Sequence, residues 1–256
     1  MSEVSSHAPG AFCWIELATT DQKAAKEFYG KLFGWSPSDS EMGPGMIYTI
    51  FKLKGCDAAA CYTLDAAKMP GVPPHWLIYV ASADAAASAR RAAELGGKVT
   101  MPAFEVGDFG KMAVLADPTG GNFCVWEAKS NKGIGINNEP GAFSWGQLNT
   151  NETAKAEAFY TALFGWTAKT GSGGGMTYTE WILGGKPIGG MMAPPPGVKV
   201  PAHWLPYFAV ADCDATAALA TSLGARTYVP PTSLEGAGRF AVLADPQGAA
   251  FALYRE

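Results

Sequence analysis

The chain has 256 residues, of which 48% are hydrophobic and 16% charged, so it has the composition of a folded globular protein. Its formal net charge of −4 and the lack of a basic run argue against a nucleic-acid partner, which requires a concentrated positive face. We expect no membrane partner, because no apolar run approaches the roughly 20 residues of a membrane span, and a cytoplasmic location, because the N-terminus lacks a signal-peptide pattern and the five cysteines include no CxxC pair.

Hydrophobic periodicity predicts the elements of the first half of the chain. A strand, a helix and two or three strands are followed by a second unit of the same kind. The expected ranges are 12–18 (strand), 21–33 (helix), 46–53 and 58–63 (strands), then 75–80 (strand), 84–95 (helix), and 98–101, 111–116 and 122–127 (strands). Alternation along the first strand places Phe12, Trp14, Glu16 and Ala18 on one face.

The second half of the chain repeats the first. The stretch FYGKLFGW at 28–35 returns as FYTALFGW at 159–166, which is 131 residues later (159 − 28). The stretch HWL at 75–77 returns 128 residues later (203 − 75) at 203–205. We expect FYxxLFGW to pack in a core, because its apolar residues recur at helical spacing. The elements expected in this half are 143–149 (strand), 152–164 (helix), 176–183 and 187–192 (strands), 203–210 (strand), 214–223 (helix) and strands through Tyr254.

A repeat of this length indicates one domain copied in tandem rather than a solenoid unit. The predicted domains are 10–128 and 142–256. The polar, Gly-rich segment 129–141 between them is interpreted as an interdomain linker. The residues before the first domain, which include His7, are expected to be loose.

In these features the sequence resembles members of the vicinal oxygen chelate superfamily. That superfamily includes glyoxalase I, extradiol dioxygenases and the fosfomycin- and bleomycin-resistance proteins. The resemblance rests on a βαβββ unit used four times, on the FYxxLFGW helix end and on the Asp-Pro-x-Gly turns, and it covers nearly the whole chain. It implies an α+β fold with four βαβββ modules in two tandem glyoxalase-like domains, in which curled mixed sheets form cups with helices outside. The layout is similar to the two-domain glyoxalase-like or hydroxylase-like subgroup, so a monomer built as a pseudo-dimer, or a weak homodimer, is expected.

In the superfamily, His and Glu side chains from four strands hold a divalent metal in the cup. At the matching places on three strands this sequence has apolar, aromatic or thiol side chains, and the fourth strand has no carboxylate or imidazole. These residues are Trp14 and Trp145, Leu77 and Leu205, and Cys124 and Ala252. The resemblance therefore implies the fold without the usual metal ligands; no cofactor is expected, and a divalent metal is possible but disfavoured. A relocated set could collect Glu16, a histidine and Cys124, which falls short of the four or so ligands of a family-type site.

Three polar residues are candidates for acid–base chemistry. Glu16 lies on an otherwise apolar strand face and needs a partner. It either pairs with a basic side chain such as Lys111 or Arg239, or acts as an acid or base or binds a polar group of a ligand. His75 and His203 each begin a strand after prolines; they either bond a loop carbonyl and hold the start of the strand, or line the cup mouth as a polar contact or general base.

Aromatic side chains dominate the cup-facing positions. These residues are Trp14, Tyr79, Trp126, Trp145, Tyr207 and Tyr254. They either fill the cups or form a pocket for a flat or apolar ligand. Gln147 and Asn149 make the second cup polar but not ionisable, and Cys124 is expected to be a small buried hydrophobe. We therefore expect the two cups to differ in ligand.

Three functions remain open. The first is a metal-free protein that binds a small, aromatic or apolar molecule. The second is a metal-dependent lyase or dioxygenase of glyoxalase type with a relocated site, or one in which Glu16 and His75 or His203 form an acid–base pair. The third is an interaction protein with filled cups. The sequence leaves open whether each cup forms within a domain or between domains.

Overall fold

The computed structural model describes residues 4–67, 69–173, 176–234, 236 and 238–256. The elements of the first half are β1 (Phe12–Thr19), α1 (Gln22–Phe33), β2 (Ser36–Gly43), β3 (Met46–Leu53), β4 (Cys56–Thr63), β5 (His75–Ala81), α2 (Ala85–Glu94), β6 (Lys98–Val106), β7 (Gly110–Ala116) and β8 (Asn122–Ala128). Those of the second half are β9 (Phe143–Asn149), α3 (Thr153–Phe164), β10 (Thr167–Gly173), β11 (Met176–Leu183), β12 (Lys186–Met192), β13 (His203–Ala209), α4 (Cys213–Ser222), β14 (Arg226–Leu234), β15 (Gly238–Ala244) and β16 (Ala250–Arg255).

Each half of the chain forms one eight-stranded mixed sheet. The strand orders are β2-β3-β4-β1-β5-β8-β7-β6 and β10-β11-β12-β9-β13-β16-β15-β14. Each sheet therefore joins the two βαβββ modules of the same half, and the cups form within domains rather than between them. In the described part of the chain no helix is long and apolar enough to cross a membrane.

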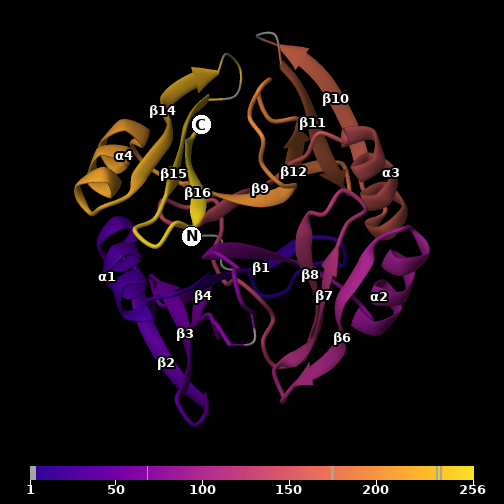
Figure 1. Cartoon of the computed structure of the whole chain (residues 1–256), viewed down its shortest axis with the longest axis horizontal. Coiled ribbons are helices and arrows are strands. Elements are labelled where there is room, and N and C mark those ends of the chain that lie inside the picture. The colour runs from indigo at the N-terminus through magenta and orange to yellow at the C-terminus, as the bar shows by residue number, and fades with distance from the viewer. Residues whose placement is uncertain (1–3, 68, 174–175, 235, 237) are drawn as a thin grey trace.

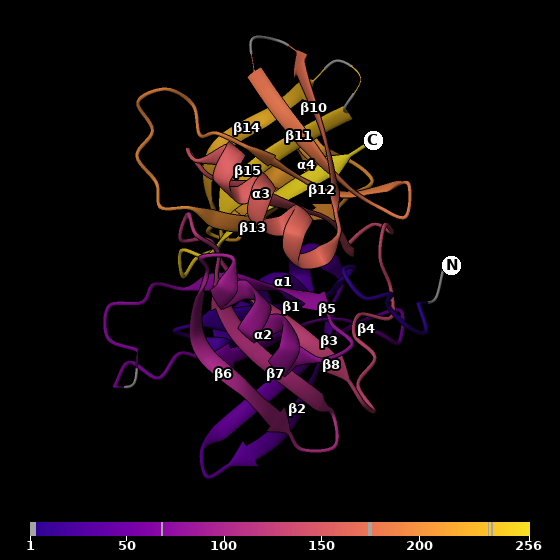
Figure 2. The same cartoon turned by 90° about the vertical axis from the view of Figure 1, so that its right-hand side faces the viewer.

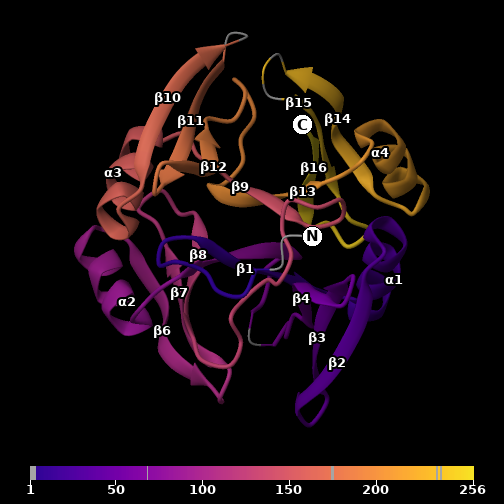
Figure 3. The same ribbon diagram turned by 180° about the vertical axis from the view of Figure 1, so that it is seen from behind.

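Both sheets curl, and their helices lie on the outer side (Figure 1). The two concave faces open in opposite directions, and the central strands β1, β5, β9 and β13 lie between them (Figures 1 and 3). We call the concave face of the first sheet the first cup and that of the second sheet the second cup. Turned by 90°, the two halves stack one on the other, with α2 next to α3 (Figure 2).

The sequence left open two or three strands after each helix, and no residue range was predicted for the edge strands β2 and β10. Strand β2, SPSDSEMG, pairs with β3 from Ser36 to Gly43, and no residue along it is buried. An exposed edge strand lacks the apolar alternation by which strands are recognised, and it carries proline and charge that discourage further pairing. Each module therefore contains its full complement of three strands after the helix.

The expected common face of Phe12 and Trp14 is wrong. Trp14 pairs with Tyr79 and Phe12 with Val80, so an irregularity interrupts the alternation between them. A bulge of this kind turns the following side chains to the other face. Phe12 consequently points into the core between the halves, where its ring lies 5.4 Å from that of Trp166, while Trp14 remains in the first cup.

The FYxxLFGW motif packs in a core, as expected, and that core lies between the two halves. The Tyr160 hydroxyl donates to Asp117 Oδ2 of the other half over 2.8 Å and accepts from Trp204 Nε1 over 2.9 Å. The equivalent contact runs in the opposite direction: the Tyr29 hydroxyl of the first half donates to Asp245 of the second half and accepts from Trp76 Nε1. The repeated motif, the repeated HW strand and the Asp-Pro turns therefore build one reciprocal interface, in which the buried tyrosine hydroxyls and tryptophan indoles have partners.

A second reciprocal contact closes the same interface. Trp35 Nε1 donates to the Gly141 carbonyl, and Trp166 Nε1 donates to the Gly10 carbonyl, each over 2.8 Å. Gly141 has φ +88°, and a Cβ on it would lie 2.9 Å from the Phe33 carbonyl oxygen. Only glycine fits there, because both the backbone conformation and the close approach exclude a side chain.

The segment between the domains is not a free spacer. Ile134 and Ile136 are each 1% exposed and belong to the main core. The Ile134 amide donates to the Cys13 carbonyl over 2.8 Å, and the Gly135 amide to the Asp57 carbonyl over 2.7 Å. The segment thus lies against the ends of β1 and β4, and its two isoleucines anchor it to the first domain.

The N-terminal segment is held by this connecting segment, which corrects the expectation that it is loose. The Val4 amide donates to the Gly135 carbonyl over 3.0 Å. His7 Nε2 lies 3.0 Å from the Ile134 carbonyl oxygen, to which it can donate. Burial lowers the pKa of the His7 imidazole, although its backbone hydrogen bonds act in the opposite direction. His7 is therefore a structural contact away from both cups.

Candidate functional site: two cups with related linings

The first cup is centred on a buried carboxylate. Glu16 is 7% exposed, and its Oε2 accepts a 2.5 Å hydrogen bond from the Tyr79 hydroxyl. The Tyr48 hydroxyl also hydrogen-bonds this carboxyl group and accepts from Trp14 Nε1 over 3.2 Å. Burial raises the pKa of the Glu16 carboxyl above its usual value, although the hydrogen bonds from Tyr79 and Tyr48 oppose that shift.

The partner of Glu16 is thus phenolic and not basic, which corrects the expected pairing with Lys111 or Arg239. The Lys111 ammonium lies 3.2 Å from Glu105, and the Arg239 guanidinium pairs with Asp214. Both cations lie in strands on the arms of the sheets, whereas Glu16 lies on the central strand β1. A carboxylate on a central strand is reached by side chains of neighbouring strands, here the tyrosines of β3 and β5.

Two further expected residues of the first cup are buried in its lining. Cys124 is fully buried next to Tyr79, its partner across β5 and β8, and burial raises the pKa of its thiol. It is the small buried hydrophobe that the sequence suggested. Trp126 is 7% exposed, and its Nε1 donates to the Asn131 carbonyl of the connecting segment over 3.0 Å. This end of the first cup is therefore tied to the connecting segment.

The second cup carries a row of hydrogen bonds with a defined direction. The Tyr207 hydroxyl donates to Gln147 Oε1 over 3.0 Å, and Gln147 Nε2 donates to Asn149 Oδ1 over 2.9 Å. Asn149 Nδ2 in turn lies 3.3 Å from Nε2 of His203, whose Nδ1 donates to the Pro201 carbonyl over 2.9 Å. Because the carbonyl can only accept, Nδ1 donates to it, and Nε2 faces the amide nitrogen of Asn149. The row orients both amides.

The aromatic lining of the second cup is separate from the main core. Leu205, Tyr207 and Ala252 form their own buried cluster. Partly buried side chains pack against it, among them Trp145, Phe240 and Tyr254. Trp145 Nε1 donates to the Tyr178 hydroxyl over 2.8 Å, as Trp14 does to Tyr48 in the first cup. The second cup thus exposes part of Trp145, whereas its counterpart Trp14 in the first cup is 4% exposed.

Both strand histidines have the structural contact that the sequence offered as one alternative. His75 Nδ1 lies 2.8 Å from the Pro73 carbonyl oxygen, and His203 Nδ1 makes the equivalent contact with Pro201. Each ring therefore holds the start of its strand. His203 also joins the polar row of the second cup, but the corresponding row is broken in the first cup, where Ala18 stands at the position of Asn149 (149 − 131).

The residues do not fit the divalent metal that the fold resemblance implies. In the described residues, no three His, Cys, Asp or Glu side chains come together as a group that could hold a metal ion. Glu16 and Cys124 share the first cup, but His75 lies at the start of β5, turned to a loop carbonyl. The relocated set suggested by the sequence is therefore not assembled.

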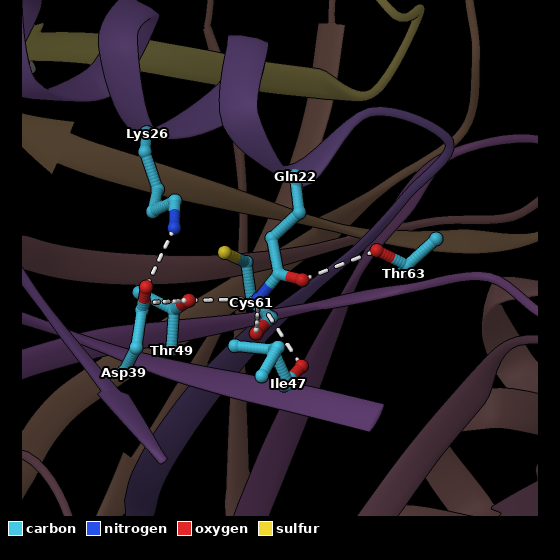
Figure 4. Close-up of polar contacts among 7 residues, drawn as sticks. All are labelled: Gln22, Lys26, Asp39, Ile47, Thr49, Cys61 and Thr63. Carbon is cyan, nitrogen blue, oxygen red and sulfur yellow. Dashed lines mark hydrogen bonds and ion pairs between the residues drawn. The ribbon is translucent and has the colours of Figure 1, made fainter. Parts of the chain in front are cut away.

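A third polar cluster lies on the helix side of the first sheet, outside the cup (Figure 4). Gln22 of α1 bonds side chains and carbonyls of β3 and β4, and Lys26 pairs with Asp39 of β2 over 2.8 Å. The remaining members are Ile47, Thr49, Cys61 and Thr63. Thr153 and Glu157 replace Gln22 and Lys26 in the second half (offset 131). Because these polar groups hydrogen-bond or form ion pairs with one another, the cluster holds the edge strand β2 against helix α1.

Sequence reasoning missed several residues of the cups, among them the equivalent pair Tyr48 and Tyr178. Each lies on the third strand of its module and accepts from the cup tryptophan. A signal was available, because the pair Tyr-Thr recurs at 48–49 and 178–179, 130 residues apart (178 − 48). Whether these tyrosines reach the cup depends on the curl of the sheet, which the hydrophobic periodicity of the sequence does not report.

The chain belongs to the glyoxalase/bleomycin resistance protein/dioxygenase superfamily. The model of that superfamily matches residues 11–125, and the model of a glyoxalase-like domain matches residues 147–254. The two matches fall on the two sheets. This membership agrees with the fold and with the recurrence of the βαβββ unit.

Relatives of similar length extend over both domains. The protein named "Putative glyoxylase CFP32" from Mycobacterium bovis is 40% identical over 258 residues, covering 100% of this chain and 98% of its own. The "Anthracycline biosynthesis protein DnrV" from Streptomyces peucetius is 35% identical over 258 residues, covering 96% of this chain and 93% of its own. The two-domain arrangement is therefore shared with proteins of different names.

Solved structures share the fold at low sequence identity. The 2,3-dioxygenase LapB from a Pseudomonas species has a TM-score of 0.65 at 14% identity, covering 96% of this chain and 93% of its own. The Mn(II)-bound glyoxalase from Novosphingobium aromaticivorans has a TM-score of 0.65 at 15% identity, covering 97% of this chain and 83% of its own. At such identities the similarity concerns the fold alone.

Proposed function

We propose that this chain binds a small aromatic or apolar molecule in its second cup, without a metal ion. The observation that carries this proposal is the lining of that cup, where Trp145, Phe240 and Tyr254 stay partly exposed around a buried cluster separate from the main core. Partly exposed aromatic rings beside a few oriented polar groups are the usual composition of a small-molecule site.

The polar row indicates what the ligand carries. Gln147 and Asn149 each use one amide N–H in the row, and each amide nitrogen has a second. No charged group belongs to the row, so the complementary ligand group is a neutral acceptor such as a carbonyl or hydroxyl oxygen. The name of one relative, an anthracycline biosynthesis protein, supports a small-molecule ligand of aromatic character.

The alternative function, a metal-dependent lyase or dioxygenase with a relocated site, needs several ligands in one cup. The donor set of the described residues does not supply them. We therefore expect Zn²⁺ or Ni²⁺ to leave the thermal melting of the chelator-treated protein unchanged. A metal bound to the folded state alone would raise the melting temperature with concentration. A rise of several degrees with either ion would instead support the alternative function.

Trp145→Ala is expected to weaken ligand binding about tenfold and to cost only about 1 kcal/mol of stability. The reason is that Trp145 is partly exposed at the cup lining and is not one of the fully buried residues. Binding is measured by isothermal calorimetry with a panel of planar phenols and quinones, and stability by urea denaturation.

The control for this variant is Phe109→Ala, which removes an aromatic ring that is 49% exposed in the first half. It is expected to leave both binding and stability near their original values. If no panel member binds, or if Trp145→Ala lowers stability as much as binding, the second cup is packing rather than a ligand site.

A further inference from the structure

The two cups differ in charge at one position while their surroundings correspond. Glu16 and Gln147 occupy the same place in the repeat (147 − 131 = 16). Each accepts from a tyrosine hydroxyl, Tyr79 or Tyr207, and each lies beside a hydrogen-bonded tryptophan–tyrosine pair. Gln147 shows that the domain can fold with an uncharged side chain at this position of the repeat. The carboxyl group of Glu16 therefore calls for a reason other than packing.

Glu16 is buried without a cation. No ion pair in the described part of the chain includes it, and no basic group contributes to its electrostatic environment. The titratable groups that face it are Tyr48 on β3, Tyr62 on β4, Tyr79 on β5 and Cys124 on β8. A buried carboxylate that lacks a positive partner is costly, so burial favours the protonated form of Glu16, and a cation in the cup would favour the ionised form.

The surroundings of Glu16 are aromatic and carry no positive charge. Three phenol rings and the indole of Trp14 lie around the carboxyl group, and none of them carries positive charge. Aromatic faces attract ammonium groups, and the attraction grows when water is excluded. A carboxylate with an ammonium ion also forms a charge-assisted hydrogen bond, which is stronger than a neutral one.

We propose that the first cup binds an organic ammonium ion, namely a protonated amine attached to an apolar or aromatic group, whose charge pairs with Glu16 among these rings. The ammonium ion favours the ionised carboxylate, so binding is coupled to release of the proton that burial favours on Glu16. A neutral ligand of the same shape cannot compensate for ionising Glu16. This inference is independent of the second cup, where Gln147 allows only neutral recognition.

The test compares 2-phenylethylamine and tryptamine with their alcohol counterparts, by calorimetry on the full chain. The amines are expected to bind at least about tenfold more tightly than the alcohols. Glu16→Gln should remove this preference and should fold, since an amide occupies the equivalent place in the second half. Phe109→Ala, which removes a ring that is 49% exposed, should leave amine binding unchanged.

A second readout uses the unaltered protein and does not depend on a variant. Because burial favours the protonated form of Glu16 and a bound ammonium ion favours the ionised form, amine affinity should rise with pH through the raised pKa of Glu16. Proton release should also appear as a difference in binding heat between buffers of different ionisation enthalpy. Equal affinity for amines and alcohols, no amine binding, no proton release, or an amine preference that survives in Glu16→Gln would each overturn the proposal.

Discussion

Phe12→Ala is expected to lower the free energy of unfolding by about 3–5 kcal/mol. The ring is 7% exposed and packs at 5.4 Å from Trp166 and 5.5 Å from Trp204, both in the other half. Gly146 and Gly189 make room for it, because a Cβ on Gly189 would lie 2.8 Å from the Phe12 ring. Rigid aromatic rings and backbone surround the vacated volume, so the cavity cannot collapse.

Urea denaturation followed by far-UV circular dichroism measures this loss. The matched control is Phe109→Ala, where the ring is 49% exposed and the change should stay within about 0.5 kcal/mol. A loss at Phe12 no larger than that of the control would show that the halves do not depend on this contact.

Asp245→Ala is expected to lower the free energy of unfolding by about 3–4 kcal/mol. One carboxylate oxygen accepts from the amides of Gln247, Gly248 and Ala249, and the other accepts from Tyr29 of the first half over 3.0 Å. Alanine leaves the buried Ala249 amide and the Tyr29 hydroxyl without this acceptor, whereas the Gly248 amide keeps its contact with the backbone carbonyl of residue 245. The substitution therefore damages both the turn between β15 and β16 and the interface.

Asp245→Asn is the matched control, because its carbonyl oxygen can still accept from the three turn amides. It should lose about 1 kcal/mol. Asp117→Ala should behave like Asp245→Ala, since Asp117 binds its own turn amides and Tyr160 in the same way. Equal melting of the alanine and asparagine variants would contradict this account.

Ionisation adds a pH dependence with a defined sign. Burial raises the pKa of Asp245 and of Glu16 above their usual values, so the folded state holds these protons more tightly than the unfolded chain. Their contribution to stability is therefore complete below the ordinary carboxyl pKa and decreases as pH rises through the raised values. Glu16→Gln should flatten only the part of this profile that belongs to Glu16.

The positions of most strands and helices could be predicted from the sequence, because the pattern of apolar residues is local. The edge strands were missed because an exposed strand has no apolar face to reveal it. Phe12 was assigned to the wrong face because a bulge is a property of strand pairing, and pairing joins residues far apart in sequence. The side chains of the candidate site were largely anticipated, but Tyr48 and Tyr178 were not.

By itself, the sequence determined that the chain contains four βαβββ modules, two in each of two repeated domains. A duplicated pattern can be recognised along the chain without knowing which residues lie close together in space. It also identified Glu16 as a carboxylate that needs a partner. Only the tertiary structure decided that modules pair within each half, that FYxxLFGW joins the halves, and that tyrosines rather than a lysine or arginine meet Glu16. These outcomes depend on the curl of the sheets, which brings together side chains that lie far apart along the chain.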